Sequence, residues 1–167
     1  MSYYQNRKHP RLQGYDYGQA GAYFVTICTH DRRPLLGHVC VGRDDLGAPL
    51  ASVILSSLGH IVRQRLDSIP TAYPTASLEH SVIMPNHIHL LLIIHSSELR
   101  AGSSRPTQLL PRIVSAFKRL TNEDAGQNLW QTGYHDHIVR NDDDYLRSWQ
   151  YIDNNPSRWA EDKYFTQ

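Results

Sequence analysis

The sequence has few cysteines, almost no net charge and no long apolar run. Its 167 residues include two cysteines, Cys28 and Cys40, which form no Cys-x-x-Cys pair. This excludes a disulfide-rich scaffold and favours reduced thiols. The formal net charge of +1 differs from the basic balance common in non-specific nucleic-acid binders, so any DNA contact has to be local. The longest apolar run, Leu90 to Ile94, is far too short to cross a membrane.

Signals for targeting and for nucleotide binding are also missing. The first residues, Met-Ser-Tyr-Tyr-Gln-Asn-Arg-Lys, contain no apolar signal core, which predicts a cytoplasmic protein without a membrane partner. The chain has no Gly-x-x-x-x-Gly-Lys phosphate-binding motif, so no nucleotide cofactor is expected. The length predicts one domain over residues 1–167, with an N-terminal arm at 1–20 and a C-terminal tail at 156–167.

Hydrophobic periodicity and turn residues predict an alternation of strands and helices. We expect strands at 22–29, 39–41, 78–84, 87–94 and 129–139, the last bulged at Gly133, and helices at 50–67, 109–120 and 141–154. The helix at 50–67 follows a loop at 42–49, and a second loop covers 96–106. Met84, Pro85 and Asn86 supply a turn between the strands at 78–84 and 87–94, which predicts a tight hairpin. Asn141 before three aspartates is a typical N-cap.

Two histidines, His87 and His89, stand at the start of the most apolar stretch of the chain. Alternate residues of a strand share a face, which places the two side chains together, about 6–7 Å apart at Cα. The apolar run that follows is typical of a central strand covered on both faces, with the histidines at its rim. Such a pair could hold one metal ion, although paired histidines are also common as structural residues.

Two histidines do not complete a metal site, so a further ligand is needed. His135 and His137 are also separated by one residue, so by spacing alone they are an alternative pair of metal ligands. We rank them second because no third ligand is evident near them.

The helix expected at 141–154 has an apolar stripe formed by Tyr145, Leu146, Trp149 and Ile152. Tyr151 lies far from the centre of this stripe, among polar residues. Asn155 stands one turn further along the same face. Its amide oxygen is of the donor type that Mg²⁺ and Mn²⁺ accept.

The two segments Met84-Pro-Asn-His-Ile-His-Leu-Leu and Tyr151-Ile-Asp-Asn-Asn-Pro together resemble the single-tyrosine transposases of the IS200 type, which carry a histidine-hydrophobic-histidine motif. The closer resemblance is to their REP-associated branch. Gly14-Tyr-Asp-Tyr, Tyr23-Phe-Val-Thr-Ile and the segment 133–141 also resemble that branch, so the likeness extends over roughly residues 7–159.

This resemblance implies a fold, a site and a reaction. The fold would be α+β, a ferredoxin-like or RRM-like antiparallel sheet with helices packed on one face. His87, His89 and Asn155 would hold a divalent metal, Mg²⁺ or Mn²⁺, and Tyr151 would be the nucleophile. The substrate would be single-stranded or hairpin DNA, cleaved through a 5′-phosphotyrosine and open to rejoining. Because dimers that exchange catalytic helices occur in the insertion-sequence branch, both a single-chain site and a homodimer stay open.

Basic side chains supply candidate DNA contacts, and two other functions remain as alternatives. The candidate contacts are Arg112, Lys118, Arg119, Arg140 and Arg147, each of which could instead be merely solvated. A metal-dependent hydrolase would use water in place of Tyr151 and would keep its activity without the tyrosine. A non-catalytic RRM-like module would bind hairpin DNA without cleaving it.

Overall fold

The computed structural model describes residues 20–43, 46–47, 49–95 and 109–161. The predicted arm, apart from residue 20, and the predicted loop at 96–106 lie outside these residues, as does the tail beyond residue 161. The prediction of one domain over 1–167 therefore stays a prediction.

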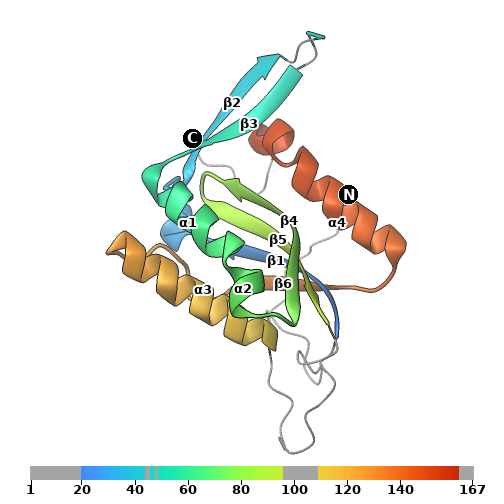
Figure 1. The fold of residues 1–167 in the computed structure, drawn as a ribbon. Helices are drawn as coiled ribbons and strands as arrows, with labels where there is room; N and C mark the ends of the chain where they lie inside the picture. The colour runs from blue at the N-terminus through green and yellow to red at the C-terminus, as the bar shows by residue number, and fades with distance from the viewer. Residues whose placement is uncertain (1–19, 44–45, 48, 96–108, 162–167) are drawn as a thin grey trace, which may run out of the picture.

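Four antiparallel strands form the main sheet, in the order β4-β5-β1-β6. Their bounds are Gly21–Cys28 for β1, Ala76–Met84 for β4, His87–Ile94 for β5 and His135–Val139 for β6. Strands β4 and β5 form a hairpin through Pro85 and Asn86, as the turn residues predict. The sheet order places β5 and β1 at its centre (Figure 1).

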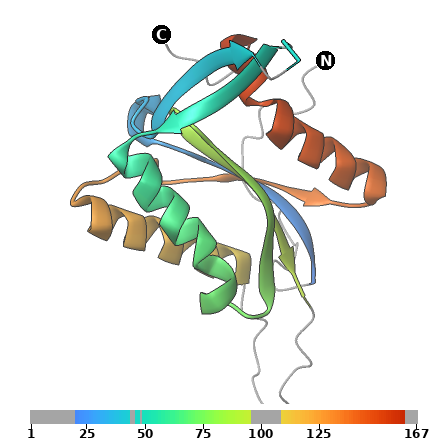
Figure 2. The same ribbon diagram turned by 45° about the horizontal axis from the view of Figure 1, so that its top comes forward.

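The antiparallel sheet with its helices confirms the α+β fold class, but helices cover both faces of the sheet, where only one covered face was expected. Strand β5 is therefore buried on each side. Helices α1 (Ser57–Asp67) and α3 (Leu109–Ala125) pack on one face, against the side chains of the odd-numbered β1 residues and the even-numbered β5 residues. Helix α4 (Asp142–Asn154) covers the other face (Figures 1 and 2). Residues of opposite parity, such as Phe24 and Leu91, pack there.

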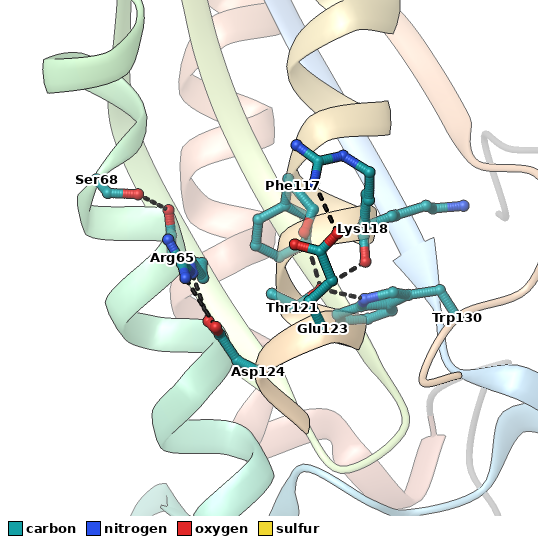
Figure 3. A network of polar contacts seen from close by, with 9 residues as sticks. Arg65, Ser68, Phe117, Lys118, Thr121, Glu123, Asp124 and Trp130 are labelled. Carbon is teal, nitrogen blue, oxygen red and sulfur yellow. Dashed lines mark hydrogen bonds and ion pairs between the residues drawn. The ribbon is translucent and has the colours of Figure 1, made fainter. Parts of the chain in front are cut away.

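Polar contacts join α1, α3 and the segment that follows α3 (Figure 3). The Arg65 guanidinium of α1 donates to the Asp124 carboxylate of α3, with Nη2 to Oδ1 at 2.8 Å. The Trp130 indole N–H donates to the Thr121 hydroxyl at 2.7 Å. This bond satisfies the polar group of a buried aromatic side chain.

A two-stranded hairpin corrects the predicted start of the first helix. Strands β2 (Gly37–Arg43) and β3 (Pro49–Leu55) pair with each other and project from the main sheet (Figure 1). Residues 50–55 therefore form a strand, and α1 begins at Ser57. Ser56 is its N-cap, with the hydroxyl accepting the Gly59 N–H at 3.1 Å. The short 3-10 helix η1 (His30–Arg32) and helix α2 (Ile69–Ala72) lie in connections.

The predicted strand at 129–139 is shorter than expected, and the predicted start of the last helix is confirmed. Only His135–Val139 pairs along β1, while Trp130 forms a single bridge with Thr29. The Asn141 side chain caps α4 by accepting the Asp144 N–H at 2.9 Å. A 3-10 helix, η2 (Pro156–Glu161), follows α4. Within the described ranges, no helix combines the length and apolar character that a membrane span requires.

Candidate active site

His87 and His89 lie on the α4 face of the central strand β5. Their cross-strand neighbours on β1 are Cys28 and Thr26, respectively. The two ring centroids are 4.6 Å apart, which confirms that the side chains share a face. The pair lies at the start of β5, as predicted, but this end of the strand is covered, and the two residues are 0% and 1% exposed. The helix and the 3-10 segment packed over this end of the strand bury them.

Each ring is oriented by a hydrogen bond at Nδ1. For His87 the partner is the Asn86 side-chain oxygen, at 2.9 Å. For His89 it is the Thr26 hydroxyl, at 2.8 Å. With Nδ1 engaged in this way, Nε2 is the nitrogen of each ring that would serve as a metal ligand.

Three residues of the predicted apolar stripe of α4, Tyr145, Trp149 and Ile152, pack against the sheet as expected, and the fourth does not. Leu146, assigned to that stripe, is 55% exposed. The buried residues of α4 are Ser148 and Ile152. Tyr151, next to Ile152, is half-buried and packs with the apolar cluster beneath the helix. The face of α4 that packs on the sheet is therefore wider than the predicted stripe and includes Ser148 and Tyr151.

Tyr151 contacts the histidine site within the same chain. Its ring centroid is 5.1 Å from that of His89, with an interplanar angle of 73°. Phe24 supports both rings: it stacks on His89 at 5.1 Å and meets the edge of Tyr151 at 5.8 Å. A single chain thus brings the predicted nucleophile beside one of the predicted ligands.

Asn155 follows Tyr151 by one turn and is 3% exposed. Along the chain, Asn155 lies between Tyr151, whose ring contacts that of His89, and Trp159, whose ring is 5.9 Å from that of His87. The residues before and after Asn155 thus contact the two histidines, and its role as third ligand stays a prediction. The donors suit a divalent ion, because two imidazole nitrogens and an amide oxygen are ordinary ligands. In the described part of the chain, no group of three or more His, Cys, Asp or Glu side chains could hold a metal.

The rival histidines lie on β6, on the other side of β1 from β5, where His135 pairs with Thr26 and His137 with Phe24. His135 is exposed. His137 is half-buried and donates from Nε2 to the Asp144 carboxylate at 2.8 Å. Although burial acts in the opposite direction, the bonds from His137 and the Arg140 N–H keep the pKa of Asp144 below its ordinary value. These contacts join β6 to the first turn of α4.

The candidate DNA contacts divide between the two faces of the sheet. Arg140 and Arg147 are exposed. Arg140 lies just before α4 and Arg147 within it, on the face of the sheet that carries His87 and His89. Arg112, Lys118 and Arg119 belong to α3, on the opposite face. Burial lowers the pKa of Lys118 to about 8, and its ammonium donates to three carbonyls of residues 131–133 at 2.6–3.3 Å. Arg119 pairs with Glu123 at 2.8 Å.

Sequence reasoning missed four residues that contact the histidine pair: Phe24, Thr26, Asn86 and Trp159. Phe24 and Thr26 lie on β1, and only the strand register brings them beside β5. Asn86 was interpreted solely as a turn residue. Its position directly before His87 was the one available signal that its side chain also contacts the histidine pair.

Comparison with known proteins identifies the fold and a relative. No protein-family model matches the sequence. A solved structure of a REP-associated tyrosine transposase bound to a REP hairpin superposes with a TM-score of 0.57, at 21% identity, and the match covers 95% of this chain and 74% of that one. This likeness shows the shared fold. An uncharacterized protein of Haemophilus influenzae is 32% identical over 178 residues, covering 96% of this chain and 93% of the relative. The chain therefore belongs to the same protein family as the Haemophilus influenzae protein.

Proposed function

We propose that this protein is a metal-dependent single-stranded DNA endonuclease and strand transferase, related to the REP-associated branch of the IS200-type transposases. The observation that carries the proposal is the contact between the Tyr151 and His89 rings, at 5.1 Å within one chain. His89 and Tyr151 belong to the two segments that carry the resemblance, one on β5 and one on α4. They are 62 residues apart in the sequence. The fold brings them together on one face of the sheet.

His87, His89 and Asn155 would hold the divalent ion, Mg²⁺ or Mn²⁺. When bound, the ion would neutralise charge that develops on the scissile phosphate. The protein residues supply the remaining functions. Asn86 and Thr26 orient the two imidazoles, and Phe24 packs against both His89 and Tyr151. These contacts keep the Tyr151 ring beside His89 in the protein without DNA.

Tyr151 would act as the nucleophile of a phosphoryl transfer. Its hydroxyl oxygen forms a bond to phosphorus while the bond from phosphorus to the 3′-oxygen of the preceding nucleotide breaks. The phenol proton is lost as the leaving 3′-oxygen gains one. The products are a 5′-phosphotyrosine and a free 3′-hydroxyl. One phosphodiester replaces another of similar energy, so a DNA 3′-hydroxyl can reverse the step and join strands.

The burial of the histidines restricts the form of the substrate. Both rings are covered by half-buried aromatic side chains, Tyr151 from α4 and Trp159 from η2. A phosphate reaches the ligand set only if this cover moves aside, and a single strand can enter more readily than a rigid duplex. Hairpin DNA presents such a strand beside its stem, and the structural neighbour is bound to a REP hairpin. We infer the same class of ligand here, met in the cytoplasm.

The decisive experiment looks for a covalent protein–DNA complex. The purified protein is incubated with labelled hairpins that carry single-stranded flanks, taken from the DNA around its own gene, in the presence of Mn²⁺. We expect a labelled adduct that survives denaturation, disappears on chelation and returns when Mn²⁺ or Mg²⁺ is restored. Tyr151→Phe should abolish it. Tyr145→Phe, a half-buried tyrosine on the same helix, is the matched control and should retain it.

The same experiment separates the alternative functions. Cleavage that continues in Tyr151→Phe would indicate a hydrolase with water as nucleophile. Hairpin binding with no cleavage under any metal condition would indicate a binding module. An adduct that persisted in Tyr151→Phe would exclude Tyr151 as the attacking residue.

A further inference from the structure

The turn that precedes β5 contains a fully buried polar side chain, that of Asn86, which is 0% exposed. Its two amide atoms face different partners. The Nδ2 group donates to the Arg32 carbonyl oxygen at 3.2 Å, and Oδ1 lies 2.9 Å from His87 Nδ1. A buried amide with two such partners has a defined orientation.

The Arg32 carbonyl determines which way this amide points. A backbone carbonyl can only accept a hydrogen bond, so the amide NH₂ must face Arg32 and the amide oxygen must face His87. The reversed amide would place two oxygens against each other. Since Oδ1 can only accept, the bond to His87 requires a proton on Nδ1.

This requirement selects one tautomer of His87. A neutral imidazole carries one proton, so a protonated Nδ1 leaves the lone pair on Nε2. Free histidine favours the opposite tautomer, with the proton on Nε2. The environment of Asn86 therefore prepares His87 to bind a metal through Nε2.

The backbone around Asn86 is held in place by contacts that do not involve its side chain. Its carbonyl accepts the Thr29 N–H at 2.9 Å, and the Pro85 carbonyl accepts the Leu36 N–H at 2.9 Å. Asp31 and Arg32 both have left-handed backbones, with φ of 54° and 53°. Non-glycine residues seldom adopt this conformation, and such strain gathers at functional sites. Here it belongs to the segment that presents the Arg32 carbonyl to Asn86.

We propose that Asn86 is a positioning residue that holds His87 in the Nδ1–H tautomer and so presents Nε2 as a metal ligand. This inference rests on the proposed metal site. It goes beyond that proposal by assigning the state of the ligand to a neighbouring side chain. Partners of this kind commonly change metal affinity by about 10- to 100-fold when they are removed.

The test measures the tautomer directly by long-range ¹H–¹⁵N NMR of the metal-free protein, well above the ordinary histidine pKa of about 6.5. In the unaltered protein we expect the His87 proton on Nδ1. In Asn86→Leu, which has a similar volume but no acceptor, we expect the Nε2–H form to gain population. The dissociation constant for Mn²⁺, measured by EPR of the free ion, should rise about 10- to 100-fold.

Two further variants separate positioning from structural support. Asn86→Asp retains an oxygen acceptor for the Nδ1 proton, so the folded protein should keep the tautomer of the unaltered protein, although it loses stability because a carboxylate oxygen then faces the Arg32 carbonyl. Asn122→Leu removes an asparagine of α3 that bonds the segment after the helix, accepting the Leu129 N–H at 2.8 Å. It should leave both the His87 tautomer and the Mn²⁺ affinity unchanged.

A proton on Nε2 of His87 in the unaltered protein would overturn the inference, whether or not Asn86→Leu folds. So would a folded Asn86→Leu with unchanged tautomer and Mn²⁺ affinity. An Nδ1–H tautomer that depends on Asn86, in a protein that binds no Mn²⁺, would support the role of Asn86 in selecting the tautomer and contradict the proposed function.

Discussion

Gly59 lies where α1 passes close to the backbone of Leu36. A Cβ atom added at Gly59 would collide with the Leu36 carbonyl oxygen, which also accepts the Ser56 N–H at 3.0 Å. Helix propensity alone favours Gly59→Ala by about 1 kcal/mol. Overpacking against a fixed backbone costs about 1–3 kcal/mol or more. We therefore expect Gly59→Ala to lower the free energy of unfolding, measured by urea denaturation.

Gly133 provides the matched control at the same scale. A Cβ added there meets nothing within 4 Å, so Gly133→Ala should change the free energy of unfolding by no more than about 0.5 kcal/mol. If Gly59→Ala were as stable as Gly133→Ala, the close approach of α1 to Leu36 would be contradicted.

At the scale of elements, the junction between β6 and α4 determines where the helix bearing Tyr151 begins. The Asp144 carboxylate is 15% exposed and accepts bonds from His137 Nε2 at 2.8 Å and from the Arg140 N–H at 3.1 Å. Loss of its charge in Asp144→Asn should reduce the free energy of unfolding near neutral pH by about 1–3 kcal/mol. Thermal or urea unfolding at several pH values measures this difference.

The expected pH dependence follows from the lowered pKa of Asp144. A carboxyl with a lower pKa in the folded state stabilises the protein above its unfolded value of about 3.9 and loses this contribution as the pH falls through the folded pKa. The difference between the unaltered protein and Asp144→Asn should therefore shrink in acid. Asp143→Asn, exposed in the same first turn, is the control for the helix dipole. An equal effect in both variants would argue against the His137 and Arg140 bonds.

Elements were predictable from the sequence where local signals agreed with long-range pairing. The Asn141 cap and the Pro85–Asn86 turn are local, and both were predicted. Strand β3 was not, because Val53 and Ile54 continue the three- and four-residue spacing of α1. Only pairing with β2, such as Val39 with Val53, makes them a strand. Non-local pairing of this kind overrides helical periodicity.

For the whole molecule, the sequence predicted the class of fold and which residues share a face, but not what covers them. The spacing of His87 and His89 was enough to place both rings together. Their burial depends on α4 and η2, which follow far later in the chain. The sequence could not decide whether Tyr151 meets the histidines of its own chain or those of a second chain in a dimer. The structure makes that contact within a single chain.

This arrangement predicts the behaviour of mixed inactive variants. His87→Ala lacks a proposed ligand, and Tyr151→Phe lacks the proposed nucleophile, so each chain alone should form no covalent DNA adduct. Because the structure brings Tyr151 to the histidine pair of its own chain, an equimolar mixture should also form none. Adduct yield per molecule of the unaltered protein should not depend on protein concentration. Recovery of the adduct in the mixture, combined with a yield that rises with concentration, would instead require two chains to exchange α4 and complete each site together.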